Sequence, residues 1–250
     1  MINKLLNLTY RALCLALFCT VVQANSIGIN FSAGTLNLGP TDQPGIVAGA
    51  NWNNISGGSG TSVALNDATG ASTTALLSFT STGAFGGFNG TNTANTATNL
   101  LYQAGLVGNP NTSEVSIDIS NIPYARYDVY VFSAADTTDT NTISITDGLT
   151  TFYQRSNGSL NNTATNLLQT TSIDPVNPTV GPGQYQVFHK TGSSVSLLTG
   201  GSINDIISNN VFGLQIVQTV PEPGTFSLIG LGLIGMRIYK HRNISSTLSV

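Results

Sequence analysis

Histidine is the side chain most often used as a general base, and the chain contains two, His189 and His241. His189 lies in the run Tyr185–Lys190, whose aromatic and β-branched residues predict a strand. Because side chains alternate along a strand, His189 should share one face with Val187 and leave Phe188 on the other. A histidine in such a strand is more often structural than catalytic, so we assign His189 no catalytic role.

Carboxylates are the other route to hydrolysis, because a glycosidase needs two facing acids. Glu114 and Asp118 lie on the same side of a predicted strand but about 13 Å apart along it, which favours two solvent-facing side chains. The chain contains no Gly-x-Ser-x-Gly elbow, no His-Glu-x-x-His motif and no Walker loop. We therefore expect no enzyme, and a secreted hydrolase is the weakest of the functional alternatives.

A calcium site is a further alternative. Asp136, Asp139 and Asn141 fall in one predicted loop and offer oxygen ligands, which calcium prefers. Their spacing matches no EF-hand, and acidic loops in exported proteins are more often merely solvated. We expect no cofactor, with calcium at this loop as the alternative.

The one tryptophan, Trp52, lies between Asn51 and Asn53. An exposed indole flanked by amides would suit stacking on a sugar, with the amides bonding its hydroxyls. A tryptophan in the core or at the edge of a sandwich is the more common arrangement. These three residues are the candidates for a glycan contact.

Short segments rich in β-branched and aromatic residues recur between turn signals, and helical periodicity is absent over any useful length. In one of them Val129 and Val131 alternate with Tyr130 and Phe132, which predicts a central strand that is apolar on both faces. The pattern favours an all-β fold, an antiparallel β-sandwich of jelly-roll type. The clearest predicted strands are 27–31, 73–79, 114–119, 127–133, 142–146, 150–154, 185–190, 194–198 and 211–218.

Charge excludes several classes of partner. Charged residues make up 8% of the chain, against roughly 25% in an average soluble domain. With 8 basic and 11 acidic residues, the chain lacks the cationic clusters that a nucleic-acid binder needs, so we expect no nucleic-acid partner. Three of the 8 basic residues and ten of the 11 acidic residues lie within 25–219, which gives that region a net charge of −7.

Residues 1–24 have the three parts of a secretory signal peptide. Lys4 and Arg11 precede the apolar run 12–22. Residues 22–24 are of types that a signal peptidase accepts, which predicts cleavage after Ala24. Both cysteines, Cys14 and Cys19, lie inside this segment, so the exported body at 25–219 would contain no thiol.

The segment 220–242 combines three elements in a fixed order. Pro221, Glu222 and Pro223 come first, an apolar stretch follows, and a basic group closes the segment with Arg237, Lys240 and Arg242. The stretch 224–239 would span about 24 Å as a helix, slightly short of the roughly 30 Å of a membrane core, a gap that snorkelling of Arg237 and Lys240 or local thinning can close. We expect a transmembrane helix there, with its basic end in the cytoplasm, the body outside, and a polar tail at 243–250.

This segment resembles the PEP-CTERM sorting signal of Gram-negative bacteria. The resemblance implies that an exosortase recognises Pro221, Glu222 and Pro223, cleaves near them and passes the body from the inner membrane to the cell surface or extracellular matrix. The body itself resembles those of secreted, PEP-CTERM-tagged proteins of unassigned activity, through strings such as Ile29-Asn30-Phe31 and Phe212-Gly213-Leu214. That likeness implies a galactose-binding-like sandwich and supplies no catalytic residues.

Three functions follow from the sequence. The leading hypothesis is an exported surface or matrix protein, sorted and anchored through its PEP-CTERM signal. The second is a carbohydrate-binding module of an exopolysaccharide matrix or biofilm. The third is the secreted hydrolase.

Overall fold

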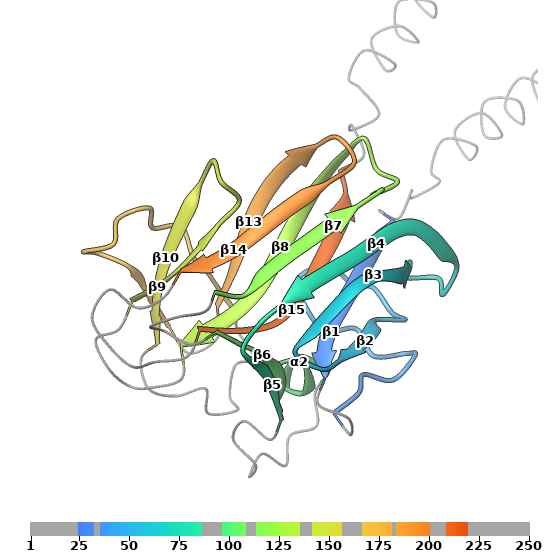
Figure 1. Ribbon diagram of the computed structural model, residues 1–250, viewed down its shortest axis with the longest axis horizontal. Coiled ribbons are helices and arrows are strands. Elements are labelled where there is room, and N and C mark those ends of the chain that lie inside the picture. Colours follow the sequence, from blue (N-terminus) through green and yellow to red (C-terminus); the bar gives the residue numbers. More distant parts are fainter. Residues whose placement is uncertain are drawn as a thin grey trace, which may run out of the picture. The chain divides into compact units, whose positions relative to one another are not determined.

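The computed structural model describes residues 25–32, 36–86, 97–108, 114–135, 142–156, 167–181, 184–200 and 209–219 (Figure 1). Residues 1–218 form one compact unit and Thr219–Val250 another. The predicted signal peptide and almost all of the second unit lie outside the described residues. Within the described ranges, no helix has the length and hydrophobicity needed to cross a membrane.

The described residues form two β-sheets. The first has eight strands, with the main order β11-β13-β8-β15-β1-β2, and β6 pairs with both β15 and β5. Its strands are β1 (Ser26–Ser32), β2 (Asn53–Ser56), β5 (Gly83–Gly86), β6 (Ala104–Gly108), β8 (Arg126–Ala135), β11 (Leu168–Gln169), β13 (Gln184–Thr191) and β15 (Asn209–Gln218).

The second sheet has seven strands in the order β12-β10-β9-β14-β7-β4-β3. Its strands are β3 (Ser59–Asn66), β4 (Ser72–Thr80), β7 (Ser116–Ser120), β9 (Thr142–Thr146), β10 (Thr151–Ser156), β12 (Thr179–Gly181) and β14 (Val195–Gly200). A short helix, α2 (Ala97–Leu101), precedes β6. The prediction of an all-β body is confirmed.

The prediction of wholly antiparallel sheets is wrong, because the sheets are mixed. Three pairs are parallel: β1 with β2, β11 with β13, and β10 with β12. In each pair one member is a strand of four residues or fewer at the end of its sheet. Such short additions carry no readable alternation, so the sequence pattern reveals neither the strand nor its direction.

The main core lies between the two sheets. Val129 and Val131 of β8 and Ile117 and Ile119 of β7 are all buried in it, while Asp118 is exposed. Phe132 is also fully buried, but in a second cluster. The prediction that this strand is central and apolar on both faces is therefore confirmed, since β8 lies between β13 and β15.

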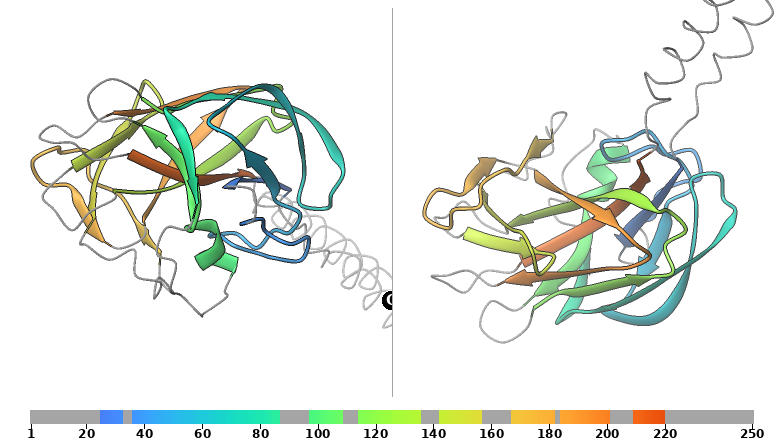
Figure 2. Two further views of the ribbon diagram at one scale, coloured as in Figure 1. Left: turned by 60° about the horizontal axis from the view of Figure 1, so that its bottom comes forward. Right: turned by 90° about the horizontal axis from the view of Figure 1, so that it is seen from above.

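The second cluster covers the outer face of the first sheet, on the side away from the second sheet. It draws its members from the segment before β2, from α2 and from the strands beneath them, and Figure 2 shows α2 and that segment on one side of the sheet. The buried members are Leu38, Trp52, Leu101, Tyr102, Phe132, Ala134 and Phe212. The first sheet is thus buried on both faces over this area.

The first and last strands of the body pair with each other. β1 runs antiparallel to β15, and Ser26 lies opposite Val217. The Gln218 N–H donates to the Asn25 carbonyl at 2.8 Å, and the Asn25 side chain donates to the Gln218 side-chain oxygen at 3.3 Å. The two ends of the body therefore lie side by side.

Candidate functional site

Trp52 is only 5% exposed, so it takes the buried position that is the more common one for tryptophan, and its ring is not open for stacking on a sugar. Its ring packs against Phe132 at a centroid distance of 6.1 Å, and its Nε1 donates to the Gly49 carbonyl at 2.9 Å. The ring also covers Gly28, where an added Cβ would lie 2.4 Å from the indole. Gly28 inside a predicted strand was the sequence signal for this contact, since such a glycine often marks a close approach.

Asn53 holds three strands together. Its amide donates to the Gly28 carbonyl at 2.8 Å and to the Asn66 carbonyl at 2.9 Å, and its side-chain oxygen accepts from the Asn66 N–H at 2.8 Å. Asn53 thereby links β1 to the end of β3 across β2. Both of its donor hydrogens are used, so its role in the folded body is structural.

Asn51 has a backbone conformation that few residues adopt, with φ at 51°. Its side chain donates to the Ala68 carbonyl at 2.9 Å, and its N–H donates to the Pro40 carbonyl at 3.3 Å. Asparagine tolerates positive φ better than most residues do. The contacts fix the position of the amide and leave its oxygen without a hydrogen bond to any described residue.

The three candidate glycan residues do meet in space. Asn51, Trp52 and Asn53 line one hollow of about 600 Å³, together with residues of β2 and β3. β2 ends the first sheet and β3 ends the second, so the hollow lies where the two sheets expose their edges.

His189 lies on the outer face of the first sheet, which it shares with Val187, while Phe188 is buried on the inner face, as the alternation along the strand predicts. Its side chain is 81% exposed, and its Nδ1 lies 2.6 Å from Oδ1 of Asp128, the residue directly opposite on β8. Sequence reasoning missed Asp128, because the partner of a residue across two strands depends on a register that alternation alone does not give.

The other acidic candidates do not form a facing pair. Glu114 and Asp118 are both exposed, and Asp118 accepts a hydrogen bond from Ser196 on the neighbouring strand. The calcium candidates Asp136, Asp139 and Asn141 lie outside the described residues. Within the described part of the chain, no group of three or more His, Cys, Asp or Glu side chains gathers.

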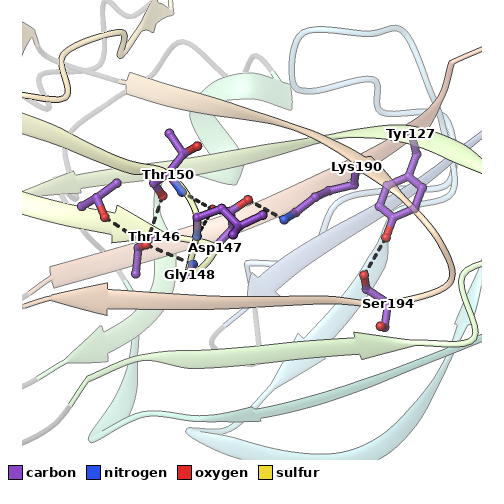
Figure 3. A network of polar contacts seen from close by, with 9 residues as sticks. Tyr127, Thr146, Asp147, Gly148, Thr150, Lys190 and Ser194 are labelled. Atoms are coloured by element: carbon purple, nitrogen blue, oxygen red, sulfur yellow. Dashed lines mark hydrogen bonds and ion pairs between the residues drawn. The ribbon is translucent and has the colours of Figure 1, made fainter.

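An ion pair joins the two sheets near the β9–β10 turn (Figure 3). Lys190 of β13 donates to Oδ2 of Asp147, while Oδ1 accepts from the N–H groups of Leu149 at 3.0 Å and Thr150 at 2.7 Å. Burial raises the pKa of the Asp147 carboxyl, but these hydrogen bonds outweigh burial and hold the pKa below its ordinary value. Gly148 takes φ at 82° here, as expected for a Thr-Asp-Gly turn.

A second polar feature lies fully inside the sandwich. Gln186 donates to Gln154 at 2.6 Å, Gln154 donates to the Ser133 hydroxyl at 2.6 Å, and that hydroxyl donates back to Gln186 at 3.0 Å. Thr170 also donates to Gln154, at 3.2 Å. All four side chains are at most 1% exposed. No pattern in the sequence indicates this network, because glutamine in a strand usually faces solvent.

Replacing Gln186 with leucine is expected to lower the free energy of unfolding by about 1–3 kcal/mol. The change removes one member of the network and leaves the Ser133 and Gln154 side chains short of a partner in a site closed to water. A urea titration at pH 7 measures the loss. A matched Gln218→Leu change, at a half-buried position at the end of β15, should cost less, and an equal cost would contradict this account.

Comparison with known proteins concerns the segment that follows the body. Residues 219–242 match the PEP-CTERM protein-sorting motif. The chain carries a PEP-CTERM sorting signal. All six predicted sorting residues, Pro221, Glu222, Pro223, Arg237, Lys240 and Arg242, lie inside the matched range and outside the described residues. No curated protein and no solved structure matches the chain.

The PEP-CTERM match indicates a protein that is sorted by way of an exosortase. It implies export, membrane association and sorting to the cell surface. β15 ends at Gln218, and the PEP-CTERM segment begins at the next residue.

Proposed function

We propose that this chain is an exported protein of the cell surface or extracellular matrix, whose body is released by an exosortase. In this proposal a signal peptide at 1–24 is removed, residues 224–239 hold the protein in the inner membrane with the body outside, and cleavage occurs near Pro221-Glu222-Pro223. The observation that carries the proposal is the PEP-CTERM match at residues 219–242.

The hydrogen-bonding of the body supports cleavage at this place. The last strand, β15, pairs with β1, β6 and β8, and its pairing ends at Gln218. A cut near Pro221 would therefore remove no residue of the described sheets. The body would remain folded after its release.

We propose further that the body is a jelly roll with added edge strands. The central strands of the first sheet follow the order β13-β8-β15-β1, and those of the second follow β10-β9-β14-β7. All pairs within these two sets of four strands are antiparallel. Sequence neighbours such as β7 and β8, or β13 and β14, lie in opposite sheets, which is the alternation that two Greek keys produce.

We also propose that the body works by binding and not by catalysis. The one described histidine has its carboxylate partner on the open outer face of the first sheet, and neither His189 nor Asp128 lines the hollow at β2 and β3. The net charge of −7 and the uncharged Ser, Thr, Asn and Gly surface suit a hydrated matrix outside the cell.

Changing Pro221 and Pro223 together to alanine is expected to abolish processing, because the exosortase then loses the rigid extended segment that it is proposed to recognise. The uncleaved protein should stay in the membrane fraction at its larger mass. Immunoblots of membrane, surface and medium fractions, with an epitope in the body, measure the distribution.

The matched control changes Pro175 and Pro178 to alanine, in the segment before β12. This variant should be processed and displayed like the unchanged protein. Normal cleavage of the Pro221/Pro223 variant, or normal cleavage in cells without an exosortase, would contradict the proposal.

A further inference from the structure

The hollow between the two sheet edges, at β2 and β3, carries a second inference that goes beyond sorting. None of its eleven lining residues is charged, and four of them are asparagines: Asn51, Asn53, Asn54 and Asn66. Its volume of about 600 Å³ lies within the range of roughly 300–1,000 Å³ that is typical of small-ligand sites. A ligand of this site should be neutral, since a buried ionic group would find no opposite charge among the lining residues.

The four asparagines divide into two that hold the fold and two that have free polar atoms. Asn53 uses both donor hydrogens on backbone carbonyls. The Asn54 oxygen accepts from the Asn30 amide at 2.8 Å and from the Leu38 N–H at 2.9 Å. These two residues fix the wall of the hollow.

Asn66 and Asn51 supply the free groups. The exposed side chain of Asn66 makes no hydrogen bond with any described residue. Its backbone N–H and carbonyl are both hydrogen-bonded to the Asn53 side chain. Asn51 has a free oxygen and a fixed backbone. An amide both donates and accepts, which matches neighbouring hydroxyl groups that do the same.

The hollow also has an apolar part. Ile55 of β2 and Val63 of β3 are partly buried, pack against the main core and line the hollow. They offer an apolar surface to the C–H face of a sugar ring, which the buried Trp52 does not. Apolar walls with a few fixed polar groups are the usual composition of a small-ligand site.

We propose that this hollow binds a neutral oligosaccharide, with Asn66 and Asn51 as the hydrogen-bonding residues and Ile55 and Val63 as the apolar surface. An extended peptide that adds a strand fits less well. β2 has four residues, the pairing of β3 shifts register twice, and Ser62 takes φ at 52°. Such irregular edges disfavour the addition of a further strand.

The test is calorimetric titration of the full-length chain with neutral gluco- and galacto-oligosaccharides, and with uronic-acid oligosaccharides of the same length. We expect binding of a neutral oligosaccharide and weaker binding of the charged ones, because the body carries a net charge of −7. Asn66→Ala should weaken the binding about tenfold without changing the melting temperature, since the side chain has no partner in the fold.

Asn51→Gly is a second, independent variant, because glycine tolerates the positive φ while removing the amide. Asn37→Ala is the matched control, since Asn37 is an exposed asparagine that does not line the hollow. Unchanged affinity in Asn66→Ala and Asn51→Gly would overturn the proposal. So would binding of an extended peptide with no binding of any neutral oligosaccharide. Either result would leave the sorting proposal unaffected, because that proposal is tested by cleavage of the chain near Pro221 and not by sugar binding.

Discussion

Replacing Trp52 with alanine is expected to lower the free energy of unfolding by about 3–5 kcal/mol, measured by urea titration at pH 7. The indole is 5% exposed and fills the space between Gly28 and Phe132 on the outer face of the first sheet. Its removal opens a cavity and leaves the Gly49 carbonyl without its donor. Gly28, which lies against the ring, has no side chain that could move into the gap.

Two variants separate packing from other effects of the change. Trp52→Phe keeps a ring in the site and should lose about 1–2 kcal/mol, chiefly the hydrogen bond to Gly49 and part of the packing. Ile173→Ala, at a side chain that is 70% exposed, should change stability little. A Trp52→Ala variant as stable as the unchanged protein would show that the ring does not belong to the core.

This result bears on how sugar binding is tested. Loss of glycan binding in Trp52→Ala would not identify Trp52 as a ligand contact, because the same variant loosens Asn51 and Asn53 on either side of the ring. Asn66 is the better probe, since its side chain has no partner in the described part of the fold. A stacking tryptophan was one alternative that the sequence left open, but the ring is buried, and the hydrogen-bonding asparagines are the residues that remain available.

Many strands of the body could be predicted from the sequence, since alternation of apolar and polar residues marks a strand with one solvent-exposed face. In β7, Ile117 and Ile119 face the core while Asp118 faces solvent, as predicted. β8 could be predicted for a different reason, because apolar residues occupy both of its faces. The short parallel strands β2, β11 and β12 were not predicted, since strands of two to four residues show no period. The antiparallel strands β3, β5 and β6 were also not among the predicted segments.

Only part of the candidate site could be predicted from the sequence. The run Asn51-Trp52-Asn53 did identify three residues around one hollow, because amides beside an aromatic ring suit a polar binding site. Burial of the ring was the favoured alternative, but neither the set of residues that buries it nor the role of Asn66 followed from the sequence. Both depend on β1, β2 and β3 lying together, and in particular on the cross-strand bonds of Asn53. The partner of His189 was missed for a similar reason, because it depends on the register between β13 and β8.

Replacing Lys190 with methionine is expected to lower the free energy of unfolding at pH 7 by about 3 kcal/mol. The side chains of Lys190 and Asp147 are only 15% and 6% exposed, so the change leaves a poorly hydrated carboxylate without its cation. Arg126→Met is the matched control. It removes the same charge from an exposed position on the adjacent strand β8 and should cost well under 1 kcal/mol.

The pH dependence of this pair has a definite sign. Because hydrogen bonds hold the pKa of Asp147 in the folded protein below its ordinary value, the pair contributes its full stability above about pH 4, the ordinary carboxyl value. That contribution is lost as the pH falls through the lowered pKa of the folded state. Urea titrations between pH 7 and pH 2 should therefore show a steeper acid loss in the unchanged protein than in Lys190→Met, where part of the pKa shift is gone. Parallel curves for the two proteins, with Arg126→Met as reference, would mean that Lys190 does not lower the pKa of Asp147.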